Sequence, residues 1–408
     1  MLTRGCSCNA LVQDLVALPR RAGEDAVEKN LMTKPLHISL DVTAVPARPA
    51  GAGRYIFELA RGLGGNAELQ TTLFARGDDA FRWEGLALDV EAVAPRSRPQ
   101  RLLWEQVRLP AALKKHGIAV HHAPHYTMPE RTKTPVVVTI HDMTFFDAPQ
   151  WHEKSKVLVF QHAIKAAVKR ATGLIAVSQD TADRVRARFG DLDVAVIPHG
   201  IDHVRFTVEE QPGERVELTK AGIPQEYIAF VGTIEPRKNL PNLIRAFDRL
   251  AVEHPSLHLV IAGQRGWALD EFDRTLAASP NKHRILLPGY LSEPLIPALL
   301  RNARAVAYPS LAEGFGLPAL EALACGAPLV AGSGSALDEV TNGGAILVDQ
   351  QDIDALTAGL EQAISEDREA ARTRGPAAAR PFRWESAVQK HIEVYRKAGE
   401  TVGVGPGR

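Results

Sequence analysis

Two carboxylates and two glycines stand close together in the run 309–321, which reads Pro-Ser-Leu-Ala-Glu-Gly-Phe-Gly-Leu-Pro-Ala-Leu-Glu. We expect a strand to end just before this run and a helix to begin within it, with Pro318 in its first turn. Glycines let the backbone approach a ligand, and the free N–H groups of a helix N-terminus bind anions or hydroxyls. Glu313 and Glu321 could therefore each hold ligand hydroxyl groups. On composition alone, a surface residue and a first-turn glutamate favoured by the helix dipole would explain them equally well.

Two adjacent cations follow another glycine turn in the run 230–239, which reads Phe-Val-Gly-Thr-Ile-Glu-Pro-Arg-Lys-Asn. We expect Arg237 and Lys238 to lie near the start of a helix over residues 240–250. Cations at a helix N-terminus oppose its dipole, so their position needs a reason. A diphosphate supplies one, because arginine can fork onto two oxygens while lysine acts as a point charge. A solvated pair before a helix is the alternative.

Short apolar runs alternate with amphipathic helical stretches over most of the chain, and this alternation is typical of parallel sheets covered by helices on both faces. The runs form two series, which predict two doubly wound α/β domains of the Rossmann-like kind, facing one another across a cleft. Ligands of such sheets bind beyond the carboxyl ends of the strands, so the cleft suits a reaction between two substrates. The first series comprises residues 36–40, 135–140, 174–177 and 194–197, and the second comprises 227–231, 257–262, 285–287, 305–308, 329–331 and 345–348.

Domain boundaries follow from this pattern. We expect residues 1–33 to be a disordered extension, residues 34–210 to form the first domain and residues 218–381 the second. A polar linker around 206–217 separates them. A final helix within 382–400 follows the completed second domain and could pack on either domain, including back on the first.

The composition of the chain excludes some classes of protein. The chain has 408 residues and no formal net charge, which argues against a dedicated nucleic-acid binder. No apolar run approaches the ~20 residues of a membrane-spanning helix. The three cysteines, Cys6, Cys8 and Cys325, provide no disulfide framework and suit a reducing cytosol.

Taken together, the two runs resemble the donor-site motifs of family 4 glycosyltransferases, which have the two-domain GT-B architecture. The Arg-Lys-Asn after a glycine turn and the Glu-x7-Glu of Glu313 and Glu321 occur in the family's order, about 75 residues apart. Segments of the first half extend the resemblance: Asp41, Gly51-Ala-Gly-Arg-Tyr55, Thr139-Ile-His-Asp142, Ala176-Val-Ser178 and Ile197-Pro-His-Gly-Ile-Asp202. Within this family, the chain resembles mannosyltransferases of polysaccharide and glycolipid assembly.

The resemblance implies a transfer of a hexose, mannose above all, from a GDP- or UDP-linked sugar to a glycan or lipid-linked acceptor, with retention at the anomeric carbon. The nucleotide sugar would be a co-substrate, and no cofactor is implied. Glu313 would contact the transferred sugar, Glu321 would hold the ribose, and Arg237 with Lys238 would neutralise the diphosphate. Further positions implied to contact the donor are Gly314, Phe315, Gly316, Leu317, Gly51, Gly53 and Tyr290 or Leu291.

The implied chemistry is electrostatic stabilisation of developing charge, and the leaving phosphate oxygen can itself take the acceptor proton. His141 is the candidate if a general base exists, because a histidine titrates near neutral pH. A structural histidine that bonds a backbone carbonyl is the alternative. We expect no metal site: His121, His122 and His125 lack a spaced carboxylate or cysteine. The Asp-x-Asp triplets at Asp191 and Asp352 fit a turn before a strand and a helix N-cap.

Other functions remain open. A nucleotide-sugar epimerase or a phosphorylase would share the architecture, and a catalytically idle GT-B scaffold would belong to another class. The intact Glu313, Glu321, Arg237 and Lys238 speak against an idle scaffold. A nicotinamide dehydrogenase is disfavoured, because no strand is followed by Gly-x-Gly-x-x-Gly with an acid ~20 residues on.

Basic and apolar residues in the first half, where the acceptor would bind, suggest contact with a membrane surface. Residues 153–190 hold eight lysines and arginines among apolar residues, and a basic amphipathic helix can lie on an anionic membrane. Arg96, Arg98 and Arg101 beside Leu102-Leu103-Trp104 form a second, weaker candidate. The alternative is a solvated helix whose apolar side packs on the sheet. We expect a cytoplasmic protein that contacts the inner membrane face peripherally and does not bind nucleic acid.

Overall fold

A computed structural model describes residues 35–47, 49 and 51–403, and the described residues from Leu36 onward form one compact unit. The first half builds a seven-stranded parallel sheet with the order β3-β2-β1-β4-β5-β6-β7. Its strands are β1 (Leu36–Asp41), β2 (Leu69–Arg76), β3 (Asp89–Ala94), β4 (Val120–Ala123), β5 (Val136–Ile140), β6 (Gly173–Ala176) and β7 (Val194–Val196). The helices of this half are α2 (Ala52–Leu63), α3 (Arg98–Val107), α4 (Leu109–Lys115), α5 (Thr144–Asp147), α6 (Lys154–Arg170) and α7 (Gln179–Phe189).

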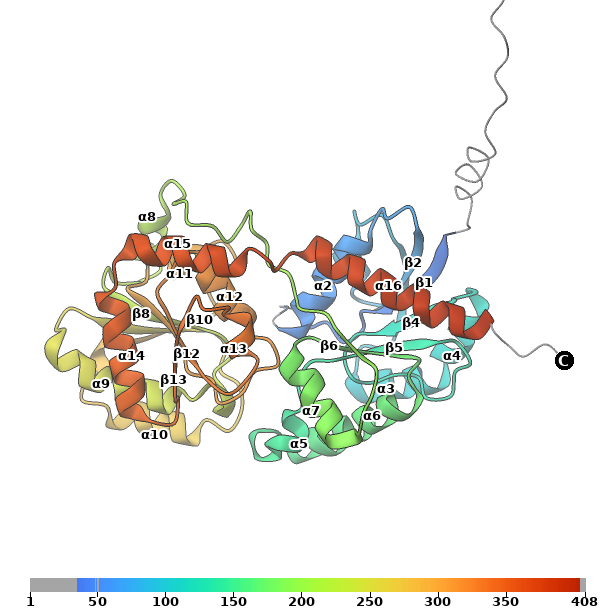
Figure 1. Cartoon of the computed structure of the whole chain (residues 1–408), viewed down its shortest axis with the longest axis horizontal. Coiled ribbons are helices and arrows are strands. Elements are labelled where there is room, and N and C mark those ends of the chain that lie inside the picture. Colours follow the sequence, from blue (N-terminus) through green and yellow to red (C-terminus); the bar gives the residue numbers. More distant parts are fainter. Residues whose placement is uncertain (1–34, 48, 50, 404–408) are drawn as a thin grey trace, which may run out of the picture. The chain divides into compact units, whose positions relative to one another are not determined.

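The second half builds a six-stranded parallel sheet with the order β10-β9-β8-β11-β12-β13 (Figure 1). Its strands are β8 (Tyr227–Val231), β9 (His258–Ala262), β10 (Ile285–Gly289), β11 (Ala305–Tyr308), β12 (Leu329–Gly332) and β13 (Ile346–Val348). Its helices are α8 (Glu214–Lys220), α9 (Leu240–Glu253), α10 (Asp270–Ala278), α11 (Leu295–Asn302), α12 (Leu317–Ala324), α13 (Leu337–Val340), α14 (Ile353–Ser365) and α15 (Arg368–Ala379). The prediction of two doubly wound α/β domains is confirmed.

The first sheet holds three strands that the apolar runs did not reveal: β2, β3 and β4. In β4 the cause is visible, because its centre carries two fully buried histidines rather than aliphatic residues. Hydrogen bonds replace the lost water: His121 contacts Ser39 Oγ at 2.9 Å, and His122 contacts Tyr395 Oη at 2.7 Å and Thr139 Oγ1 at 2.9 Å. A polar strand can therefore occupy the centre of a sheet if its partners are supplied by distant segments.

The chain crosses between the two domains twice, at neighbouring places. Ile201 bridges to Arg383, and a Cβ on Gly200 would lie 2.1 Å from Trp384 N, so only glycine fits where the crossings touch. After the second crossing, α16 (Trp384–Gly403) packs on the first domain against α2, β4, β5 and β6 (Figure 1). The part of the expected linker from Glu214 onward is not extended: it belongs to α8, whose Glu214 contacts buried Arg301 of α11 at 3.1 Å.

Strand order explains why the two chemical runs meet. β8 and β11 are neighbours in the second sheet, yet their crossover connections leave in opposite directions, which makes this position the switch point of the sheet. The run 230–239 follows β8 and the run 309–321 follows β11. In the first sheet the Gly51 loop follows β1, next to the corresponding switch point between β1 and β4.

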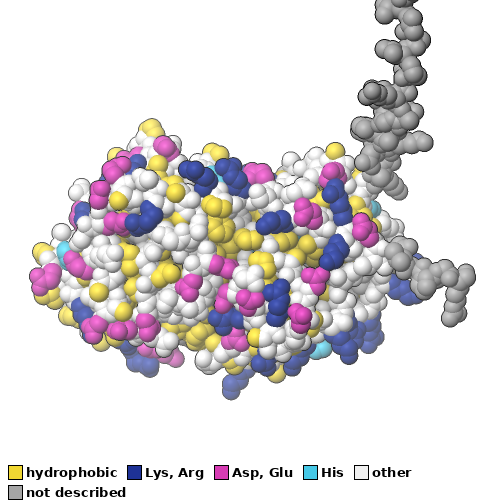
Figure 2. Space-filling view, viewed as in Figure 1, with side chains coloured by type: hydrophobic (Ala, Val, Ile, Leu, Met, Phe, Trp, Pro, Cys, Tyr) yellow, Lys and Arg dark blue, Asp and Glu magenta, His cyan; other side chains and the backbone are white. Residues whose placement is uncertain are grey.

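Charges of both signs are interspersed over the face shown in Figure 2, as expected for a chain whose formal charges cancel. The described residues contain no helix that combines the length and apolar character needed to cross a bilayer. The expected extension, residues 1–33 with Cys6 and Cys8, lies outside the described residues.

Candidate active site

The loop after β8 turns sharply so that its two cations face the cleft. Pro236–Lys238 form a single 3₁₀ turn, and Asn239 then adopts φ 53° before α9 begins. Asparagine tolerates this left-handed conformation better than most residues, and its side-chain amide donates to Gln350 O at 2.6 Å. The motif Arg-Lys-Asn therefore acts through its local conformation. Asn239 makes the turn, and Arg237 and Lys238 before it line the cavity.

Glu313, from the loop after β11, contacts both cations. Its Oε2 lies 2.5 Å from Arg237 Nη1, and its Oε1 accepts a hydrogen bond from Lys238 Nζ. Lys238 also donates to Tyr308 Oη at 2.6 Å, and Arg237 contacts Glu235 Oε1 at 2.7 Å. The group is buried, with Glu313 only 8% exposed. The structure therefore brings together three site residues predicted from two distant runs.

Electrostatics keeps this cluster ionised. Burial by itself raises the pKa of Glu313, but Arg237 and Lys238 outweigh burial and lower that pKa to about 2. Burial lowers the pKa of Lys238, and Glu313 offsets part of this effect. Without a ligand the two cations are neutralised by carboxylates, so an incoming diphosphate must compete with Glu313 for them.

A cavity of about 360 Å³ opens in front of the cluster and is lined by both domains. The second domain contributes Gly232, Thr233, Glu235, Arg237, Lys238, Tyr308, Glu313, Gly314, Phe315, Gly316, Leu317 and Pro318. The first domain contributes Gly51, Ala52, His125, Tyr126, His141, Asp142, Phe145, Phe160, Val177 and His199. The predicted Gly314–Leu317 segment and His141 thus lie on the same cavity as Glu313.

His141, at the end of β5, has a defined tautomer. Its Nε2 lies 2.8 Å from Pro124 O, and because a carbonyl can only accept, Nε2 carries the proton. Burial lowers the pKa of His141, so the ring is neutral at neutral pH and Nδ1 is an acceptor. Both sequence interpretations hold in part: His141 bonds a backbone carbonyl and it lines the cavity. The lowered pKa makes it a weaker base than an ordinary histidine.

A second compartment of about 160 Å³ adjoins the first and shares five lining residues with it, among them Gly51, Gly232 and Leu317. Apolar residues form one side, including Val231, Leu291 and Ile296, and Tyr290 also lines it. Its carboxylates are Glu293 and Glu321, and Glu321 in α12 is the buried one, 6% exposed. A flat apolar group beside a carboxylate is the chemistry that a nucleoside base and ribose require, and this compartment continues directly into the cationic one.

Arg54 reaches Glu321 from the other domain. This arginine lies in the first turn of α2, and its Nη1 is 3.3 Å from Glu321 Oε1. Burial raises the pKa of Glu321 to about 7, although Arg54 and Arg205 oppose the shift. Glu321 is therefore poised to titrate near neutral pH.

The two glycines of the first loop have different roles. Gly51 lines both compartments and adopts φ 49° immediately before α2, as expected for close approach to a ligand. Gly53 lines neither compartment: it lies inside α2, where a Cβ would meet Pro46 Cδ at 2.9 Å. The absence of a side chain at Gly53 thus allows the loop to pack closely, and a role of this glycine in approaching the diphosphate stays a prediction.

The domains touch directly beside the cavity. A Cβ on Gly314 would come within 1.7 Å of His141 O, so the second-domain loop sits against the end of β5 only because residue 314 is glycine. Thr181 Oγ1 lies 3.4 Å from Gly314 O and 3.5 Å from His141 O. This contact closes the cavity from one side.

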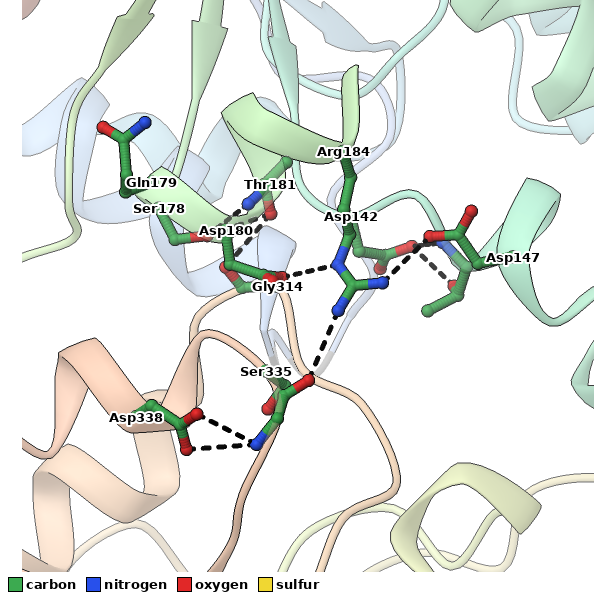
Figure 3. A network of polar contacts seen from close by, with 12 residues as sticks. Asp142, Asp147, Ser178, Gln179, Asp180, Thr181, Arg184, Gly314, Ser335 and Asp338 are labelled. Carbon is green, nitrogen blue, oxygen red and sulfur yellow. Dashed lines mark hydrogen bonds and ion pairs between the residues drawn. The ribbon is translucent and has the colours of Figure 1, made fainter. Parts of the chain in front are cut away.

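Figure 3 shows the adjoining contacts of α7 with the second domain. Arg184 is held by Asp180 at 2.8 Å and donates to Gly334 O at 3.3 Å. In addition, Gln179 N donates to Glu339 Oε1 at 2.8 Å. On another side, Trp267 Nε1 of the second domain donates to Trp151 O of the first at 2.7 Å. The structure is thus a closed arrangement of the two domains.

Several site residues were not assigned a role from the sequence. Arg54, Asp142 and His199 lie inside motifs of the first half, and Glu235 lies two residues before Arg237. Nothing local indicates that Arg54 lines the smaller compartment and the other three the larger one. Tyr308 was noted only as the end of a strand. A signal did exist: each stands directly after a predicted strand or within a glycine loop, where parallel sheets place ligand contacts.

Metal ligands were also considered. Among the described residues, no group of three or more histidine, cysteine or carboxylate side chains could hold a metal ion. Asp352 is the N-cap of α14, accepting from Asp354 N and Ala355 N, as predicted. Asp193 lies at the turn before β7 and pairs with Lys397 at 2.7 Å.

Replacing Glu321 should separate stability from ligand binding. As pH rises from about 4.5 to about 7, the unfolded chain loses this proton before the folded protein does, so the free energy of unfolding falls by about 3 kcal/mol. Glu321→Gln removes that loss. We expect the variant to be about 3 kcal/mol more stable than the parent at pH 8, and within about 1 kcal/mol of it near pH 5.

Urea denaturation at the two pH values measures the effect, with the half-exposed Glu226→Gln as control. If Glu321 holds the ribose, as the resemblance implies, the same variant should bind a nucleoside diphosphate at least about tenfold more weakly, because an amide NH2 replaces one of the two accepting carboxylate oxygens. An unchanged pH dependence of stability would contradict the assignment.

The fold and the cleft define the class: two doubly wound domains with a nucleotide-type compartment at their interface constitute the GT-B architecture. Comparison with known families gives the same result. Residues 217–380 match the family described as Glycosyl transferases group 1, and residues 49–205 match Glycosyltransferase Family 4. O-antigen chain mannosyltransferase B of Escherichia coli is 30% identical over 303 residues, which cover 73% of this chain and 77% of that protein.

Solved structures share the fold. Sucrose-phosphate synthase from Thermosynechococcus elongatus matches with a TM-score of 0.71 at 19% identity, covering 90% of this chain and 100% of that one. Anabaena HepE in complex with UDP-glucose matches with a TM-score of 0.67 at 19% identity, covering 90% and 99%. The chain belongs to the family 4 glycosyltransferases.

Proposed function

We propose that this glycosyltransferase transfers mannose from a nucleotide-diphosphate sugar to a glycan or lipid-linked acceptor in the cytoplasm, with retention at the anomeric carbon. The observation that carries the proposal is the cluster of Glu313, Arg237 and Lys238 at the switch point of the second sheet, next to the compartment of Glu321. The sugar assignment is supported by the mannosyltransferase of Escherichia coli that the chain resembles.

In this proposal, the residues of the two compartments have different roles. Glu321 and the apolar compartment bind the nucleoside, while Arg237 and Lys238 stabilise the charge that grows on the diphosphate as its bond to the anomeric carbon breaks. Glu313 faces the transferred sugar and stabilises positive charge on its ring. The acceptor oxygen forms the new bond to that carbon, and its proton passes to the leaving phosphate oxygen. His141 accepts a hydrogen bond from a sugar hydroxyl through Nδ1.

A donor screen tests the proposal. Thermal shift and mass spectrometry should be recorded with GDP-mannose, UDP-glucose and UDP-N-acetylglucosamine, because a ligand of the folded state stabilises it by about 2.7 kcal/mol at one hundred times its Kd. We expect GDP-mannose to stabilise the protein and to be hydrolysed slowly. Stabilisation by UDP-glucose alone would overturn the choice of sugar, and no response from folded protein would favour an idle scaffold.

Turnover should not require a divalent metal, since Arg237 and Lys238 supply the positive charge that a metal ion supplies elsewhere. We expect the initial rate of donor hydrolysis or transfer to be the same in excess chelator as in added Mg²⁺ or Mn²⁺. A rate that collapses on chelation and returns with one added metal would contradict metal independence.

We also propose peripheral membrane contact through α6. Its buried side chains, among them Phe160 and Ile164, pack on the sheet, whereas Leu158 is 71% exposed beside Lys154 and Lys165. The second candidate is weaker than expected, because Trp104 is buried and Arg101 donates to Thr43 O. Leu103 of α3 remains exposed.

Flotation with anionic vesicles should carry the protein upward, and less so at high salt, where charge attraction is screened. Leu158→Glu should abolish the flotation, and Val252→Glu, an exposed valine of α9, serves as the matched control. Parent protein that remains wholly in the soluble fraction would contradict the contact.

A further inference from the structure

The first-domain wall of the larger cavity is aromatic and carries one carboxylate. Tyr126, Phe145 and Phe160 contribute rings, and Asp142 contributes the acid. Phe145 and Phe160 stack with centroids 4.5 Å apart, and the ring of Tyr126 meets Phe160 at 5.3 Å. Rings beside a few fixed polar groups are typical of small-molecule sites, and they suit the apolar face and hydroxyl edge of a sugar.

This wall is held in place before any ligand arrives. Asp142 Oδ1 accepts from Thr144 N at 2.9 Å and from Thr144 Oγ1 at 2.5 Å, and Asp142 N donates to Tyr126 Oη at 3.1 Å. Tyr126 itself adopts φ 61°, a conformation that costs free energy in a tyrosine. A strained backbone conformation of this kind persists only where the surrounding structure holds it. Here the hydrogen bond between Asp142 N and Tyr126 Oη holds the tyrosine ring next to Asp142.

The lining residues of the first-domain wall carry only negative charge. Among the described residues that line the cavity, the first domain contributes no lysine or arginine, and Asp142 is its one carboxylate. Its histidines are neutral, because burial lowers the pKa of His125 to about 3 and also lowers those of His141 and His199. The two cations of the cavity belong to the second domain and contact Glu313. Arg98 does not line the cavity, although its guanidinium lies 5.4 Å from the centre of the Phe160 ring. Among the lining residues of the first domain, an anion would therefore meet only the negative charge of Asp142.

We propose that the acceptor group entering this cavity is an uncharged sugar, held by Asp142 through its hydroxyls and by the aromatic wall, and that Asp142 rejects acceptors with a phosphate at that position. The inference rests on the proposed function only in placing the donor on the second domain. It adds a substrate class, neutral glycan ends over sugar phosphates, and a specificity residue. Specificity here is built from repulsion as well as attraction.

The test uses methyl α-mannopyranoside and mannose 6-phosphate as probes, with binding followed by saturation-transfer NMR in the presence and absence of nucleoside diphosphate. We expect the neutral glycoside to bind and the phosphate ester to bind on the order of a hundredfold more weakly. Equal or preferred binding of the phosphate ester would overturn the proposal, and so would binding of neither sugar.

Asp142→Asn removes the charge and keeps the shape, so it should reduce the discrimination between the two probes at least about tenfold. Asp193→Asn, an 82% exposed carboxylate outside the cavity, is the matched control and should leave the discrimination unchanged. Unchanged discrimination in Asp142→Asn would overturn the role of this residue. Nucleoside diphosphate binding is measured in the same samples, and its absence would count against the proposed function. The sugar-binding measurements made without nucleotide test the acceptor proposal separately.

Discussion

Glu313→Gln is expected to lower kcat by about 10²- to 10³-fold and, at the same time, to tighten the binding of a nucleoside diphosphate. The first effect follows from the proposed role of the carboxylate, which is to face the sugar carbon on which positive charge develops, and loss of one such interaction typically has this size. The second follows because Arg237 and Lys238, which Glu313 neutralises in the ligand-free protein, become available to the diphosphate. We expect the nucleotide Kd to fall by about tenfold, or ~1.4 kcal/mol.

The same substitution should lower stability without nucleotide, because two buried cations lose their shared partner and breaking such a pair costs about 3–5 kcal/mol. Glutamine is therefore preferable to alanine, which would also leave a cavity. Thermal denaturation with and without nucleoside diphosphate, with isothermal titration calorimetry, measures both effects. Glu369→Gln on exposed α15 is the control.

Lys238→Ala should also abolish turnover, but its effect on nucleotide affinity should be opposite to that of Glu313→Gln. Loss of a cation should weaken nucleotide binding. Two variants that lose activity while shifting nucleotide affinity in opposite directions cannot be explained by general misfolding. If Glu313→Gln retained full activity, or weakened the nucleotide as Lys238→Ala does, the assignment of the cluster would be wrong.

Gly314→Ala should prevent the domains from closing while leaving each domain folded. The new Cβ would lie 1.7 Å from His141 O and 3.0 Å from Asp142 Cβ, and neither backbone can move without displacing the end of β5. Because closure assembles a site from both domains and excludes water, we expect kcat to fall by about 10²-fold or more, in keeping with the cost of small misplacements of reacting groups.

Nucleotide binding should change much less than kcat, because the residues proposed to hold the nucleotide lie mainly on the second domain. Small-angle scattering with nucleotide should show a larger radius of gyration for the variant than for the parent. Gly77→Ala is the matched control, since its nearest described neighbour would be Ala92 O at an ordinary 3.6 Å. A variant with parental kcat and parental compaction would show that this contact is not part of the active arrangement.

The fold was largely predictable because β-branched apolar runs alternate with amphipathic helices. The exceptions are instructive. β4 was missed because its buried centre is His121 and His122, whose partners Ser39, Thr139 and Tyr395 come from other elements. The start of α8 was placed in a linker because its polar residues satisfy one another only through α11, where Arg301 and Asn302 meet Glu214.

The donor loops were predictable for a different reason: their chemistry is local. A glycine turn, an arginine–lysine pair and a left-handed asparagine, or two glutamates around a glycine loop, lie within a dozen residues of one another and directly after strands. The order of the strands then places both loops at one switch point, which the sequence pattern implied only through the two-domain architecture.

The sequence by itself thus determined the two-domain α/β fold and the residues that present charge to the cavity, because both depend on periodicity and on short-range turns. Tertiary structure alone decided which of these residues meet across the cleft. The Arg54–Glu321 pair, the tautomer of His141, the carboxylate of Asp142 in the cavity wall and the close approach of Gly314 to His141 each join residues brought near by packing. The physical reason is that burial and interdomain contact set their charges and hydrogen bonds, and neither leaves a local signal in the chain.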